Sequence, residues 1–199
     1  VGMRARAGIS IGSMTEQQRI ILHRILSATL SSQGYLKATG VFHLDNLLNM
    51  LVDTSYSKKE FDENVRQRLI DLKWGHGNFY LAFFSSPTEK NWGYKIEGHH
   101  LSVNITFTGD QLSVTPWFIG SDPAEIRVTQ YAGWRLLGQE EDLGIKLINI
   151  LSPAQQKKAT MNTEVPADMI TGAESGKRLI DYWGLKATEM DKGQKDILL

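Results

Sequence analysis

The feature that most constrains the fold is a change in hydrophobic period near residue 78. Before this point, apolar residues recur every three to four positions, which is typical of amphipathic helices. From residue 78 to residue 118 they alternate or form short aromatic runs such as NFYLAFFSS, which is typical of strands. The turn residues TGD at 108–110 indicate a hairpin between two of these strands. The sequence therefore predicts an α+β fold in which a small antiparallel β-meander packs against several helices.

Four helices are predicted to cover this meander, at residues 15–32, 44–52, 138–151 and 153–161. Two of them start with a capping box, in which a hydroxyl residue is followed by glutamine three positions later, as in Thr15 with Gln18. Residues 1–14 lack periodicity and are predicted to form an N-terminal arm, followed by a single α+β domain at 15–199. The final KDILL only just establishes an apolar face, so we expect this domain to be incomplete at its C-terminus.

Composition excludes several classes of function. The chain carries 22 basic and 22 acidic residues, so it has no net field that would attract nucleic acid. It has no cysteine, which excludes disulfides, thiolate catalysis and cysteine-ligated metals. No apolar run approaches the roughly 20 residues of a transmembrane helix, and no glycine-rich phosphate-binding motif is present. A small-molecule enzyme and a binding module remain open.

The most concentrated chemistry lies in the stretch WGYKIEGHHLSVN, where two histidines are adjacent. We interpret residues 95–107 as one strand, whose side chains alternate between two faces. Glu97 and His99 then lie at the rim of the core face, and His100 lies on the other face. A bulge at Gly98 would bring both imidazoles to one side. The alternative is structural, with one solvated ring and one hydrogen-bonded ring.

A second informative stretch, WRLLGQEEDLGIKLINIL, is predicted to be helical. In this projection Glu140 falls in the middle of an apolar arc, and Glu141 lies at its edge. A buried carboxylate costs several kcal/mol unless it is paired, protonated or bound to metal, so Glu140 needs a partner such as His99, His100 or Arg135. Alternatively, the helix starts later and both glutamates are exposed in its first turn, where they favour the positive end of the helix.

The first functional hypothesis is a metal-dependent enzyme of the hydrolase type. His99, His100 and Glu140 would bind the metal, and Glu97 or Glu141 would orient a ligand or act as general base. Imidazole and carboxylate ligands suit a divalent ion such as Zn, Fe, Mn or Ni. Three protein ligands would leave an open position at which water is activated.

The residues assigned to substrate binding are Ser102, Asn104 and Trp92. The first two follow His100 along the polar face of the predicted strand, and they would serve equally if His100 acted as a general base without any metal. A second hypothesis is a non-catalytic binding or assembly module, in which Trp92, Trp117 and Trp134 line a groove. A third is that a second copy, in a homo-oligomer, or a different chain completes an exposed sheet edge.

Four segments together identify a family resemblance: WGYKIEGHHLSVN, TPWFIGSDPAEI, GWRLLGQEED and ILSATLSSQGYLKA. They resemble the family catalogued as domain of unknown function 3500, in the same order and across nearly the whole chain. The resemblance implies no established activity. It implies that members are longer, with a C-terminal section that contains a histidine-rich strand motif. A site built from GHH and those later histidines would be only partly present in this chain, or completed by another subunit.

Overall fold

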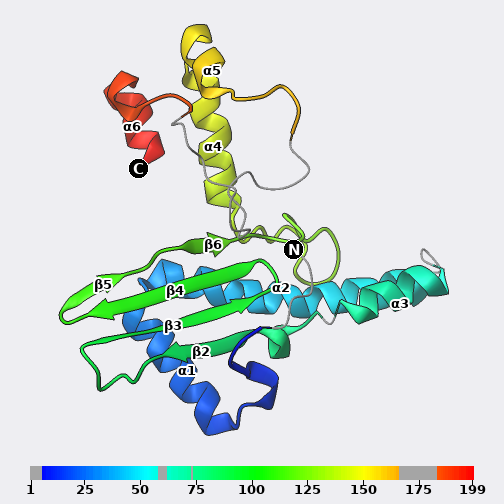
Figure 1. Cartoon of the computed structure of the whole chain (residues 1–199). Helices are drawn as coiled ribbons and strands as arrows, with labels where there is room; N and C mark the ends of the chain where they lie inside the picture. Colours follow the sequence, from blue (N-terminus) through cyan, green and yellow to red (C-terminus); the bar gives the residue numbers. More distant parts are fainter. Residues whose placement is uncertain (1–5, 58–61, 73, 166–182) are drawn as a thin grey trace. The chain divides into compact units, whose positions relative to one another are not determined.

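The computed structural model describes residues 6–57, 62–72, 74–165 and 183–199 (Figure 1). Its internal contacts divide the chain into two units, residues 1–137 and residues 138–199. The predicted single domain at 15–199 stays a prediction.

One antiparallel sheet organises the first unit. Its strands in the described part of the chain are β1 (Ile9–Ser10), β2 (Tyr80–Phe84), β3 (Asn91–Gly98), β4 (Leu101–Thr108), β5 (Gln111–Ser113) and β6 (Trp117–Ile119). They are ordered β1-β2-β3-β4-β5, and β6 also pairs with β4. The predicted antiparallel meander is therefore confirmed. β5 pairs with the end of β4 and β6 with its beginning, so the chain returns to the start of β4 after the meander.

The predicted single strand at 95–107 is wrong, because the chain reverses at the two histidines. Gly98 pairs with Leu101, so His99 and His100 form a two-residue turn between β3 and β4. His100 has φ 55°, the left-handed conformation that such tight turns require. A histidine tolerates this conformation better than most side chains do, which is why the turn is not visible as a glycine or asparagine signal.

The turn also changes which residues share a face of the sheet. Ile96 lies opposite Val103, and both are fully buried on the side that carries the core. Glu97 lies opposite Ser102 on the other face. The predicted grouping of Glu97 with the core residues of the following strand is therefore wrong, because two turn residues separate the alternation in β3 from that in β4.

Helices α1 (Glu16–Thr29) and α2 (Ser32–Ser57) lie on one face of the sheet, and α3 (Glu63–Asp71) follows (Figure 1). The predicted first helix and its capping box, Thr15 with Gln18, are confirmed. The helix predicted at 44–52 is instead the middle of the much longer α2. Gly34 lies in the first turn of α2, where its N–H donates to the Ser31 hydroxyl.

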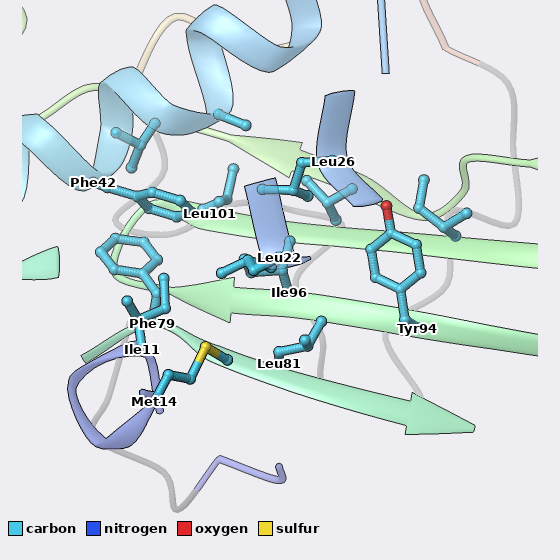
Figure 2. Packing of buried hydrophobic residues seen from close by; sticks show 14 residues of the cluster. Ile11, Met14, Leu22, Leu26, Phe42, Phe79, Leu81, Tyr94, Ile96 and Leu101 are labelled. Carbon is cyan, nitrogen blue, oxygen red and sulfur yellow. The ribbon is translucent and has the colours of Figure 1, made fainter. Parts of the chain in front are cut away.

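The main core lies between α1, α2 and this face of the sheet, and Figure 2 shows its packing. Its largest fully buried side chains include Tyr94, Phe79, Leu22 and Leu26. Ile11 and Met14, from the segment predicted as an arm, are also buried in this cluster. Ile11 opens the short 3-10 turn η1 (Ile11–Ser13), which follows β1, and Met14 comes directly after this turn. Ile9 and Ser10 of the predicted arm therefore pair with β2, and Ile11 and Met14 pack against the core.

The second unit contains α4 (Gly138–Ile150), α5 (Pro153–Ala159), the 3-10 turn η3 (Ala187–Glu189) and α6 (Lys192–Leu198). The helices predicted at 138–151 and 153–161 are confirmed, as is the capping box of α5, Ser152 with Gln155. α6 begins with its own capping box, Asp191 with Gln194. None of the helices in the described ranges combines the length and the apolar content that a membrane crossing requires.

Candidate metal centre

The β3–β4 turn brings the two imidazoles together. The ring centroids of His99 and His100 lie 4.1 Å apart, with the ring planes at 76°. Because His100 is in the left-handed conformation, its side chain does not diverge from that of His99 as neighbouring side chains on a strand do. The turn therefore brings the two imidazoles to one side, which the sequence predicted from a bulge at Gly98.

A third donor, Asp122, reaches the same place through β6. Ile119 pairs with Leu101, and the Gly120 N–H donates to the His100 carbonyl oxygen at 2.8 Å. Asp122 follows two residues later, with its Oδ2 3.8 Å from Nε2 of His100. One ligand atom from each of His99, His100 and Asp122 lies within 4.8 Å of the other two. The three side chains can therefore converge on one ion.

A fourth residue, Asp45 of α2, holds His99. Its Oδ1 lies 2.7 Å from Nδ1 of His99, and its Oδ2 accepts the Gly75 N–H at 3.0 Å. Asp45 is 2 % exposed, so this carboxylate is shielded from water and both of its oxygens have partners within the protein. Such a carboxylate behind a histidine is the usual support of a metal-binding imidazole.

The surroundings favour the neutral form of His100. Burial lowers its pKa, and the neighbouring His99 lowers it further, whereas Asp122 and Asp45 oppose the shift. A neutral imidazole is the form that can coordinate a metal. The indole of Trp74 flanks the site, with its ring centroid 6.0 Å from that of His99.

The donor set fits a divalent transition metal. Two imidazole nitrogens and one carboxylate oxygen suit Zn, Fe, Mn or Ni better than Mg or Ca, which prefer oxygen alone. With three protein ligands, such an ion keeps one or more positions for water or substrate.

Comparison with known proteins places the whole chain in one family. The sequence profile of the family described as protein of unknown function (DUF3500) matches residues 2–199. The chain belongs to the DUF3500 family. No curated protein and no solved structure matches it. The family description assigns no reaction to DUF3500 proteins.

The structure gives the other predicted residues of the first unit different surroundings. Glu97 is paired with Lys95 at 2.6 Å on the face of the sheet opposite the core. Asn104 donates from Nδ2 to the Pro116 carbonyl oxygen at 2.8 Å. Ser102 lies on the same face as Glu97, between β3 and β6. The structure therefore brings His99 and His100 together, and it engages Glu97 and Asn104 in contacts with other protein groups.

Trp92 is part of an aromatic stack rather than of the centre. Its ring lies 4.3 Å from that of Phe107, at an angle of 11°. Trp92 pairs with Phe107 and Trp117 pairs with Val103. These two partners are four positions apart on β4, which corresponds to about 13 Å at roughly 3.3 Å per residue. Trp134 packs against His43 in a second hydrophobic cluster. Trp92 and Trp134 therefore pack against different hydrophobic clusters, and the predicted groove stays a prediction.

Glu140 and Glu141 lie in the first turn of α4, and both are exposed. This matches the alternative given by the sequence, in which both carboxylates are exposed in the first turn and interact favourably with the positive end of the helix dipole. They belong to the second unit, whereas the two histidines belong to the first. The roles predicted for Glu140 as a ligand and Glu141 as a base therefore stay predictions.

Two residues of the centre, Asp45 and Asp122, were not predicted. Asp45 continues the buried stripe of α2 at helical spacing after Ala38 and Val41, a pattern that becomes visible only when the helix is extended back to Ser32. Asp122 lies in the sequence SDP, which indicates only a turn. Its proximity to the histidines depends on the pairing of β6 with β4, which no local pattern reveals.

Proposed function

We propose that this DUF3500 chain is a metal-dependent hydrolase that binds one divalent ion through His99, His100 and Asp122. The observation that carries the proposal is the convergence of the three ligand atoms within 4.8 Å. A bound ion of this kind lowers the pKa of a coordinated water to about 7, which makes hydroxide available as a nucleophile near neutral pH.

The protein side of this chemistry is the preparation of the ligands. Burial lowers the pKa of His100, so its ring resists protonation, the state that would prevent coordination. Asp45 holds the ring of His99 at 2.7 Å, which limits its rotation before the ion arrives. Both effects reduce the reorganisation that metal binding would otherwise require.

The other predicted residues take the remaining roles in this proposal. Glu97 or Glu141 would accept the proton of the attacking water, and Ser102, Asn104 and Trp92 would contact the substrate. To act as a base, Glu97 would have to leave its ion pair with Lys95. To contact the substrate through its amide N–H, Asn104 would have to break its hydrogen bond with the Pro116 carbonyl oxygen. A separate base is less necessary when the nucleophile is bound to a metal, because the metal-bound water already loses its proton near neutral pH.

The first experiment is elemental analysis of protein purified without added metal or chelator. We expect close to one divalent ion per chain in the wild type and its loss in His100→Ala and Asp122→Asn. His23→Ala is the matched control, because His23 is exposed and contacts Tyr35 rather than the centre. Glu140→Ala belongs in the same series, where loss of metal would make α4 a contributor to the site.

Addition of Co²⁺ or Ni²⁺ gives an independent reading, because these ions quench nearby indoles. We expect saturable quenching that disappears in Trp74→Phe, since Trp74 flanks His99. The loaded protein is then assayed on chromogenic carboxylate and phosphate esters. Absence of metal in the wild type together with absence of quenching would contradict the proposal and give the histidines a structural role.

A further inference from the structure

Asp45 contacts two groups at once. Its Oδ1 lies 2.7 Å from Nδ1 of His99, and its Oδ2 accepts the backbone N–H of Gly75 at 3.0 Å. Asp45 and Gly75 are both buried, so water cannot replace either partner without cost. The carboxylate therefore joins α2, the loop before β2 and the β3–β4 turn at a single point.

An ionised carboxylate accepts hydrogen bonds and donates none. The short contact to Nδ1 therefore requires the proton on that nitrogen, and it leaves the lone pair of a neutral ring on Nε2. We infer that Asp45 is the positioning residue that fixes the tautomer of His99, with the proton on Nδ1 and with Nε2 available as the ligand nitrogen. The ligand part of this inference rests on the proposed function, whereas the tautomer does not.

Replacement by asparagine sharpens the inference, because an amide cannot satisfy both donors. The buried Gly75 N–H needs an acceptor, so the single amide oxygen of Asn at 45 turns toward it. The amide nitrogen then faces Nδ1 of His99 and donates to it. The ring proton moves to Nε2, where it blocks coordination. In serine proteases, the same exchange behind a catalytic histidine also produces the wrong tautomer.

The tautomer can be measured without any metal. We would record two-bond ¹H–¹⁵N correlation spectra of the imidazoles in the metal-free full-length chain, about two pH units above the ordinary imidazole pKa of about 6.5. His99 is assigned by the loss of its signals in His99→Gln. We expect a protonated Nδ1 in the wild type and a protonated Nε2 in Asp45→Asn. The control is Asn46→Ala, which removes the acceptor for His76 and leaves the Asp45 contacts intact.

Zinc affinity, measured by titration against a competing chelator, supplies the second readout. We expect Asp45→Asn to bind Zn²⁺ about 10 to 100-fold more weakly than the wild type, and Asn46→Ala to match the wild type. A circular dichroism spectrum equal to that of the wild type shows that the weakening does not come from unfolding.

The possible results separate the two ideas. A wild-type His99 protonated on Nε2, or an Asp45→Asn variant that keeps the proton on Nδ1, would overturn the inference. A third result is that the wild type has the expected tautomer and Asp45→Asn inverts it, but the wild type binds no Zn²⁺. In that case the positioning role of Asp45 stands and the proposed function fails.

Discussion

The ring of Phe79 packs directly against Gly98, where a β-carbon would lie 2.3 Å from Cδ1 of Phe79. Phe79 is completely buried, and Gly98 is the last residue of β3 before the histidine turn. The absence of a side chain at 98 therefore lets the core close directly beneath the candidate metal centre.

Gly98→Ala should destabilise the protein, because the added methyl group must displace a ring that is fixed by the core. Overpacking of this kind costs about 1–3 kcal/mol in the free energy of unfolding. Gly144→Ala is the matched control, since nothing lies within 4 Å of its β-carbon position. In the middle of α4 it should stabilise by about 0.5–1 kcal/mol. Urea unfolding of both variants measures the two effects, and changes of the same sign would contradict the packing described here.

Gly120→Ala should act on the centre rather than on stability. A β-carbon at 120 would lie 2.5 Å from Nδ1 of His100, so the ring must move away from its present position. We expect Zn²⁺ affinity to fall by about tenfold, with a change of less than about 1 kcal/mol in the free energy of unfolding. Competition titration gives the affinity, and Gly144→Ala should leave it unchanged. An unaltered affinity in Gly120→Ala would show that the orientation of His100 does not matter for the ion.

The sequence predicted the fold class well because its signals are local. The change of period, the capping residues Thr15 and Ser152, and the aromatic run of β2 each determine a nearby element. The centre was predicted in part, since the adjacent histidines are visible in the sequence. Asp45 and Asp122 were missed because their contacts span 54 and 22 positions, respectively, and depend on a helix boundary and on a strand crossover. The turn at His99 and His100 was missed because it lacks glycine or asparagine.

Stability at alkaline pH should depend on Tyr94. Burial raises the pKa of this phenol above its ordinary 10.0, and a hydrogen bond with Thr29 only partly offsets the shift. The unfolded chain therefore loses this proton first, and stability should fall as pH rises above about 10. Tyr94→Phe should cost about 0.5–1.5 kcal/mol near neutral pH through the lost hydrogen bond, and it should weaken the alkaline fall.

Urea unfolding of the wild type and of Tyr94→Phe between about pH 8 and pH 11 measures this effect, with the window taken from the ordinary tyrosine pKa of about 10. Tyr80→Phe is the control, because Tyr80 is half-buried and lies on the face of the sheet opposite the core. This variant should keep the alkaline fall of the wild type. An equal pH dependence in all three proteins would exclude Tyr94 as its source.

In the second unit, the capping boxes of α5 and α6 are joined through their glutamines. The amides of Gln155 and Gln194 donate to each other's oxygen, at 3.0 Å in both directions. The same oxygen of Gln194 also accepts the N–H of Asp191, the residue that caps α6. Gln194 is 5 % exposed, whereas Gln155 is half-buried and Asp191 is exposed.

Gln194→Ala should therefore destabilise α6 by about 0.5–1.5 kcal/mol for each hydrogen bond lost, because water can replace the side chain at Asp191 and Gln155. Gln194→Glu should recover only part of this loss, because an ionised carboxylate accepts from Asp191 but cannot donate to Gln155. Amide hydrogen exchange within α6 is the appropriate measurement, since it reports on this helix separately. Lys192→Ala removes only an exposed pair with Asp196 and should change protection by less than about 0.5 kcal/mol. Equal protection in Gln194→Ala and Lys192→Ala would mean that the joined capping boxes do not stabilise this unit.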